Sequence, residues 1–205
     1  MKILITLAVL MVLAQSAAAT TVQELQLGWA VANYELDGDN QAARFEALII
    51  EAEAAVEANP KDPELLIWQG ILKSTYAGKA SGLSALSLVK GARSSFEKAL
   101  SIDDMAMQGS AYTSLGALYY QVPGWPIAFG SDKKARQMLE KAVQLNPAGI
   151  DSNYFHGDFL LQQKEYGAAK VAFEKALAAP DRLGRTLADS GRRGEIRSRL
   201  ANIES

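Results

Sequence analysis

Apolar side chains recur along this chain at the spacing of a helix face. Three segments share one pattern, in which an alanine is followed after four positions by a bulky apolar residue and after seven by another alanine; they are residues 92–100, 135–143 and 169–177. This spacing places the three positions on one side of an amphipathic helix. A fainter copy precedes Asn59 and Pro60. The chain therefore reads as a series of related helices, and no segment indicates a β-strand.

The same periodicity predicts eight helices paired as four hairpins, followed by a ninth helix that closes the array. The predicted ranges are 23–36 with 40–58, 62–77 with 84–102, 105–121 with 132–146, 150–164 with 167–179, and 187–203. Pro147 and Pro180 end two of the second helices. The predicted fold class is all-α, an α-solenoid of about four hairpins plus a C-terminal capping helix. Residues 20–205 are expected to form its single domain.

The spacing between the repeats indicates which type of helical repeat they are. The second helices share an alanine, at Ala55, Ala99, Ala142 and Ala176, and the intervals between them are 44, 43 and 34 residues. A period of 34 residues is that of the tetratricopeptide repeat. The first helix of that repeat carries an aromatic residue, Leu-Gly and a tyrosine, and this chain supplies Tyr112, Leu115, Gly116 and Tyr119.

The final repeat keeps part of the same pattern, with Gly157 in its first helix and Ala169, Phe173 and Ala176 in its second. On these residues the chain resembles the tetratricopeptide repeat superfamily over about residues 40–180. Small residues at the shared positions would let neighbouring helices approach closely. The resemblance implies a helical solenoid whose concave groove binds a protein segment.

Two intervals exceed the 34-residue period and predict insertions between the helices of two hairpins. The first lies within residues 74–91, and the second is the Pro- and Trp-containing stretch 122–130. In this layout the chain is similar to the TatT-type tetratricopeptide proteins of TRAP transporter systems, and also to the tetratricopeptide part of the regulators of microtubule dynamics. The TatT resemblance implies a periplasmic protein that associates with a solute-binding protein.

The first residues read as a targeting segment. Lys2 precedes an apolar run over residues 3–14, and small residues at 17–19 fit the requirements of signal peptidase. We therefore expect residues 1–19 to be a signal peptide, with Thr20 as the mature N-terminus and the periplasm as the location. A buried N-terminal helix is the alternative. No cysteine follows the small residues, so no stable membrane anchor is expected after cleavage.

Composition limits the chemistry. The 205 residues carry a net charge of −2, which gives no support to nucleic acid as a partner. With no cysteine and one histidine, no disulfide, metal site or cofactor is expected. Acidic residues dominate residues 20–64, whereas residues 180–205 hold six arginines. These charges either steer a partner or are solvated faces, the arginine-rich helix then serving as the cap of the solenoid.

No catalytic constellation emerges, so we expect the protein not to be an enzyme. Ser131 and Lys134 match a Ser-x-x-Lys spacing, but Ser131 at a helix start is more typical of an N-cap. The single histidine, His156, falls on a packing position of the final repeat, which favours a core role over acid–base chemistry.

The favoured function is a non-catalytic protein–protein interaction or scaffold module. Repeat geometry places two sets of side chains on the groove, Ser110, Thr113, Ala117 and Tyr120 in one first helix and Asp151, Tyr154, Asp158 and Leu161 in another. The candidate binding face consists of Trp68, Thr113, Tyr120, Trp125, Phe129, Tyr154 and Asp158. The alternative is the binding of a small apolar or amphipathic solute near Trp68, Tyr120 and Trp125. The sequence does not decide whether the protein forms a homo-oligomer.

The insert at residues 123–130 carries two large apolar residues, Trp125 and Phe129. Loops of repeat proteins project from one face and commonly carry binding. If Trp125 is exposed, it is an interaction anchor. If it folds back between repeats, it is a structural plug, and the sequence does not separate these two interpretations.

Overall fold

The computed structural model describes residues 20–204, and the predicted signal peptide lies outside them. Within that range the chain forms only helices, as predicted: α1 (Val22–Tyr34), α2 (Gly38–Ala58), α3 (Pro63–Ala77), α4 (Gly82–Ile102), α5 (Ala106–Gln121), α6 (Asp132–Leu145), α7 (Ile150–Gln162), α8 (Tyr166–Leu177) and α9 (Thr186–Glu204). Each end lies within two residues of its predicted position. None of these helices is long and apolar enough to span a membrane.

Local sequence sets several of the helix starts. Thr21 and Glu24 form a reciprocal capping box at the start of α1. The Asp62 carboxylate accepts hydrogen bonds from two amides of α3, which has Pro63 in its first turn. Ser131 accepts from the Lys134 amide and caps α6, which confirms the N-cap interpretation of the Ser-x-x-Lys spacing.

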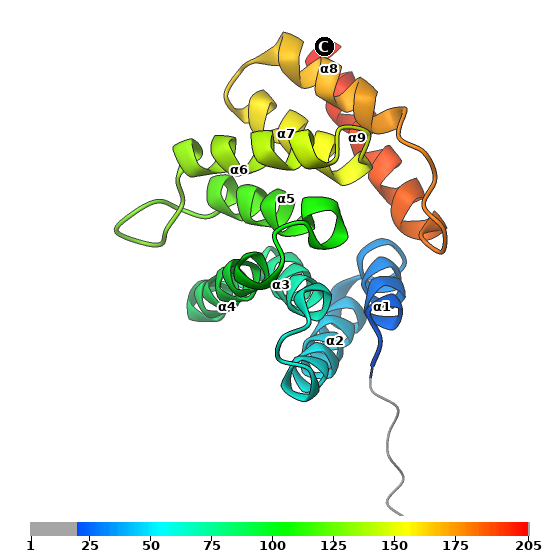
Figure 1. Cartoon of the computed structure of the whole chain (residues 1–205). Coiled ribbons are helices and arrows are strands. Elements are labelled where there is room, and N and C mark those ends of the chain that lie inside the picture. The colour runs from blue at the N-terminus through cyan, green and yellow to red at the C-terminus, as the bar shows by residue number, and fades with distance from the viewer. Residues whose placement is uncertain (1–19, 205) are drawn as a thin grey trace, which may run out of the picture.

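The helices pair as four antiparallel hairpins and a closing helix. α1, α3, α5, α7 and α9 each contact the next helix of that series, and each second helix packs against the hairpin that follows it. α9 also contacts α1, so the array curves into a ring in which the first and last helices of the described chain meet (Figure 1).

Close packing between helices depends on the small residues that the repeat pattern marked. The shared alanines are at most 2% exposed. A Cβ atom at Gly116 would lie 2.7 Å from Leu139 Cγ, and one at Gly157 would lie 2.9 Å from the Phe173 ring. Only glycine therefore permits these helix contacts, as predicted. The large side chains of Phe45, Phe96, Phe159 and Phe173 are fully buried in the core between the helices.

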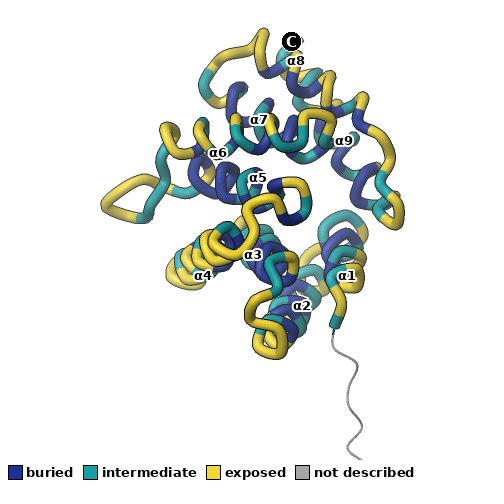
Figure 2. Tube along the Cα trace, in the orientation of Figure 1, coloured by how far each residue is buried: buried dark blue, intermediate teal, exposed yellow. Residues whose placement is uncertain are grey.

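The two predicted insertions differ in structure. The first is not a loop, because residues 78–81 alone join α3 to α4 and the additional residues lengthen α4, which has 21 residues against 12 in α8. Its extra length begins at the largely exposed Leu83. The second insertion is a loop between α5 and α6, and Figure 2 shows that most of it is exposed.

Candidate functional site

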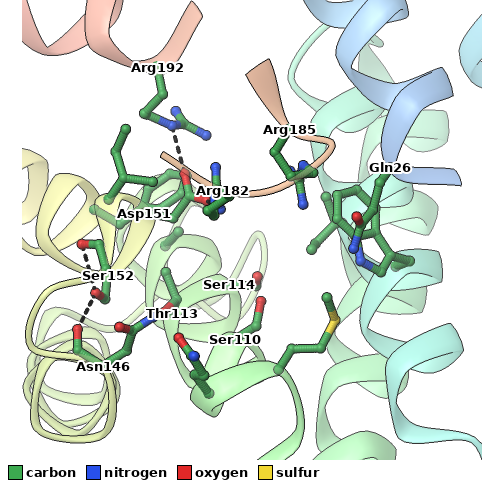
Figure 3. A pocket seen from close by; sticks show the side chains of 18 of the residues that line it. Gln26, Ser110, Thr113, Ser114, Asn146, Asp151, Ser152, Arg182, Arg185 and Arg192 are labelled. Carbon is green, nitrogen blue, oxygen red and sulfur yellow. Dashed lines mark hydrogen bonds and ion pairs between the residues drawn. The ribbon is translucent and has the colours of Figure 1, made fainter. Parts of the chain in front are cut away.

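A cavity of about 680 Å³ lies on the inner side of the ring. Its lining comes from one helix of every hairpin (α1, α3, α5 and α7), from residues 180–185 that lead into α9, and from Arg192 of α9 (Figure 3). Ligand sites in proteins commonly have volumes of about 300–1,000 Å³. The cavity is therefore the place where the whole array contributes side chains to one site.

Two tryptophans form the apolar wall on the N-terminal side of the cavity. The rings of Trp29 and Trp68 meet edge to face with their centroids 6.1 Å apart. Trp29 Nε1 donates a hydrogen bond to Thr75 Oγ1 at 3.0 Å. The buried Trp68 Nε1 has no hydrogen-bond partner within residues 20–204. A buried N–H without an acceptor costs roughly 1–3 kcal/mol, so Trp68 presents an unused donor.

Ion pairs fill the opposite side of the cavity, centred on Asp151 of α7. Arg182 Nη1 and Arg192 Nε each donate to one Asp151 carboxylate oxygen at 2.8 Å. Arg182 also binds both carboxylate oxygens of Asp189, and Arg192 binds Glu195. Burial raises the pKa of Asp151, but the charges of Arg192 and Arg182 outweigh burial and lower that pKa to about 2. Asp151 is therefore charged throughout the neutral range.

Arg185 lies between these two walls and has no charged partner. Its guanidinium carbon is 5.1 Å from the centroid of the Trp68 ring, and its Nε is buried with no hydrogen-bond partner. Arg185 forms no ion pair with any residue of the described range. Burial and the nearby Arg182 lower the pKa of Arg185. Figure 3 shows its side chain between the Asp151 cluster and Gln26.

The start of α5 has an unusual backbone where it meets the cavity. Met107, Gln108 and Gly109 have positive φ angles of 49°, 58° and 76°. For the two residues that are not glycine, such a conformation costs about 1–3 kcal/mol each, and strain of this kind concentrates at binding sites. Met107 and Gln108 both line the cavity.

The structure divides the predicted binding residues among three places. Only Trp68 and Thr113 line the cavity. Tyr120, Tyr154 and Asp158 are buried where α5, α7 and α9 meet: the Tyr120 hydroxyl donates to Asp158 at 2.7 Å, Arg199 pairs with Asp158 at 2.9 Å, and Arg192 lies 4.3 Å from the Tyr154 ring centroid. The Trp68, Tyr120 and Trp125 set that the solute interpretation grouped is therefore not assembled at the cavity. That these seven residues bind a partner stays a prediction.

The groove positions predicted from the repeat agree with the cavity lining better in α5 than in α7. Ser110, Thr113 and Ala117 line the cavity as the repeat geometry predicts, and of the α7 positions Asp151 does so. α9 covers the remaining face of α7, because Arg192 and Arg199 pack on Tyr154 and Asp158.

The two aromatic residues of the insert differ in their exposure to solvent. Trp125 is 90% exposed, so the plug interpretation is wrong for this residue. Phe129 is half-buried: its ring meets the Tyr119 ring edge to face at 5.9 Å and lies under the Arg93 guanidinium at 5.0 Å. Phe129 therefore fixes the loop on α5 and α4, while Trp125 and the exposed Ile127 face solvent.

His156 does not belong to the cavity. It is half-buried on α7, and burial lowers its pKa, which favours the neutral ring. Within residues 20–204, no group of three or more His, Asp or Glu side chains is arranged to hold a metal ion.

Sequence reasoning missed the two most distinctive lining residues, Arg185 and Met107. The arginine content of residues 180–205 was a signal, but it could not separate the arginines that fasten α9 from the one that lacks a carboxylate. No sequence pattern around Met107 predicts a left-handed turn.

Comparison with known proteins supports the repeat assignment. Residues 150–180 match the tetratricopeptide repeat family. Among solved structures, a thermophilic TPR protein from Thermus thermophilus is 20% identical with a TM-score of 0.57, covering 88% of this chain and 98% of that one. A structure of MamA is also 20% identical, with a TM-score of 0.48 over 80% of this chain and 89% of that one. A search of curated proteins finds no match.

The likeness to the Thermus thermophilus protein, the helix pairing and the buried small residues agree on the architecture. Residues 150–180 match the tetratricopeptide repeat, and the described chain has an all-α solenoid fold like that of a tetratricopeptide-repeat protein.

Proposed function

We propose that this protein is a non-catalytic interaction module whose central cavity binds a segment of a protein partner. The observation that carries the proposal is the composition of the cavity wall, which takes side chains from every hairpin and from α9. A wall made by the whole array is what a binding groove requires, because each repeat alone offers only a few contacts. The strained turn at Met107 and Gln108 supports the same assignment.

The chemistry of the lining favours binding over catalysis. Its serine and threonine side chains have no histidine beside them, since His156 is not among the lining residues. Asp151 is engaged by two arginines, which leaves it unsuited to accept a proton. The site can therefore recognise and hold a ligand.

The proposed location is the periplasm, and it rests on the signal-peptide pattern of residues 1–19. The layout resemblance to TatT-type proteins makes a periplasmic solute-binding protein the proposed partner. The exposed Trp125 and Ile127 offer a second contact surface on the outside of the ring.

A photo-cross-linking amino acid placed inside and outside the ring tests the proposal. Gln108 lines the cavity and is exposed, so p-benzoyl-phenylalanine at this position should give a discrete cross-linked partner in cells. Ile50 on α2 is 66% exposed and does not line the cavity, which makes it the matched control. Equal cross-linking from both positions, or none from Gln108, would overturn the assignment of the cavity.

A small amphipathic solute is the second candidate ligand, favoured by the closure of the ring. The Tyr34 hydroxyl of α1 donates to Glu195 of α9 at 3.0 Å, so the array is not an open groove at its ends. A bounded cavity of about 680 Å³ suits a compact ligand.

A further inference from the structure

We infer that Arg185 and Trp68 form a recognition point for a single carboxylate attached to an apolar body. The inference rests on the proposed binding role of the cavity and adds the chemistry of the ligand. Both side chains line the cavity, and both carry a buried N–H without an acceptor within residues 20–204.

First, the Arg185 side chain donates no hydrogen bond to the nearby carboxylates, which bind the other arginines. Both oxygens of Asp151 accept from Arg182 and Arg192, and both oxygens of Asp189 accept from Arg182. Glu195 accepts from Arg192 and from the Tyr34 hydroxyl. Arg185 makes no hydrogen bond to this network, which holds two arginines and three carboxylates. Its charge balances the network, and what its side chain lacks is a hydrogen-bond acceptor.

The second step concerns the charge and shape of the missing acceptor. A guanidinium with an unpartnered N–H calls for an acceptor, and a planar carboxylate matches the fork of N–H donors on arginine. The acidic residues of the lining, Glu64, Asp151 and Asp181, disfavour a dianion such as phosphate. A carboxylate between the guanidinium and the indole would accept from Arg185 and from Trp68 Nε1.

The third step concerns the rest of the ligand. Trp68 lies beside Arg185, and the apolar residues Trp29, Ile71, Met107 and Phe155 line the same cavity together with polar ones such as Ser114. These apolar side chains offer contact area to an aromatic or branched aliphatic group but few hydrogen bonds. Such a carboxylate is found on a free organic acid and at the C-terminus of a polypeptide, and both share the chemistry that the site requires.

Titration with matched probes tests this inference in the mature chain. The first pair is 4-phenylbutyrate and its neutral amide, and the second is the peptide Ala-Ala-Val-Phe with a free and with an amidated C-terminus. The readout is the indole N–H resonance of Trp68, assigned by comparison with Trp68→Phe, together with the affinity from calorimetry. We expect a carboxylate to bind and to shift the Trp68 resonance, and each matched amide to bind at least tenfold more weakly.

Each outcome has a defined meaning. Binding of 4-phenylbutyrate alone identifies a free acid as the ligand type, and binding of the free peptide alone identifies a chain end. Equal binding of acid and amide, or no binding of either acid, overturns the carboxylate site. Cross-linking from Gln108 would be unaffected by that failure, so the proposed function is judged separately.

Variants of Arg185 separate recognition from folding. Arg185→Gln should weaken acid binding at least tenfold and leave the melting temperature unchanged or higher, since it removes a partly buried charge that has no partner. Arg193→Gln is the control, because Arg193 pairs with the exposed Asp181 and does not line the cavity. Full binding by Arg185→Gln, or a marked loss of stability, would show that Arg185 is a structural residue.

Discussion

Replacing Asp151 by asparagine should destabilise the protein in a way that depends on pH. Asp151 joins α7 to α9 and to the segment before α9, because its two carboxylate oxygens accept from Arg192 and Arg182. Asparagine keeps the shape of the side chain and removes the charge. The substitution therefore tests the electrostatic contribution rather than packing.

The expected magnitude follows from the pKa of this carboxyl group. Folding lowers the pKa from 3.8 to about 2. Each pKa unit corresponds to about 1.4 kcal/mol, so the charged form stabilises the folded protein by about 2 kcal/mol at neutral pH. Because the folded pKa is the lower one, this stabilisation is present above pH ~4 and is lost as the pH falls towards 2. By pH 3 about half of it should remain.

Urea unfolding followed by circular dichroism at pH 7 and pH 3 measures the effect. Asp151→Asn should lower the free energy of unfolding by about 2 kcal/mol at pH 7 and by about half as much at pH 3. Asp181→Asn is the matched control: its carboxylate pairs with Arg193 at 2.8 Å, but the side chain is 86% exposed. That change should cost less than about 0.5 kcal/mol at either pH. A loss for Asp151→Asn that is equal at both pH values would refute the electrostatic explanation.

Three other predictions concern the loop, the packing and the N-terminus. Trp125→Ala should leave the melting temperature unchanged and weaken partner capture. Phe129→Ala should lower the free energy of unfolding by about 1–2 kcal/mol, since only Phe129 packs on the helices. A loss of thermal stability for Trp125→Ala and none for Phe129→Ala would contradict the loop assignment. Gly70→Ala should destabilise by about 1–3 kcal/mol in urea unfolding, because the added Cβ would lie 2.4 Å from the ring of the fully buried Phe96. N-terminal sequencing of the exported protein should begin at Thr20, and retention of the first methionine would reject both the signal peptide and the periplasmic location.

The fold was predictable because its information is local. Helix periodicity, the small residues at Gly116 and Gly157, and the capping signals at Ser131 each act within one helix or one hairpin. A repeated period then fixes how hairpins stack, since each buries the same face against the next. Small residues over 74–91 marked the first insertion without showing that it lengthens a helix; α4 begins at Gly82, two residues before the predicted start at residue 84. Propensity is a weak guide when a long helix packs along a neighbour.

The candidate site was less predictable because it depends on how distant segments meet. Repeat positions identified Ser110, Thr113, Ala117 and Asp151, which all line the cavity. In contrast, α9 covers Tyr154 and Asp158. The left-handed turn at Met107 and the missing partner of Arg185 are properties of the assembled ring. Neither feature can be predicted from residues that recur at a fixed spacing in the sequence.

Closure of the ring also decides which kind of ligand the cavity suits. An open solenoid can bind a long segment that runs from one repeat to the next and beyond its ends. Here α9 returns to α1, and the contact is close: a Cβ atom at Gly191 would lie 2.4 Å from the Tyr34 ring, so only glycine allows it. The same contact brings Glu195 to Tyr34 and completes the network that leaves Arg185 without a carboxylate. A ligand that ends inside the ring can place a terminal carboxylate on Arg185, whereas a segment that passes through the ring could reach Arg185 only with an acidic side chain. The geometry that limits the length of the ligand is therefore the geometry that prepares the site for a terminal carboxylate.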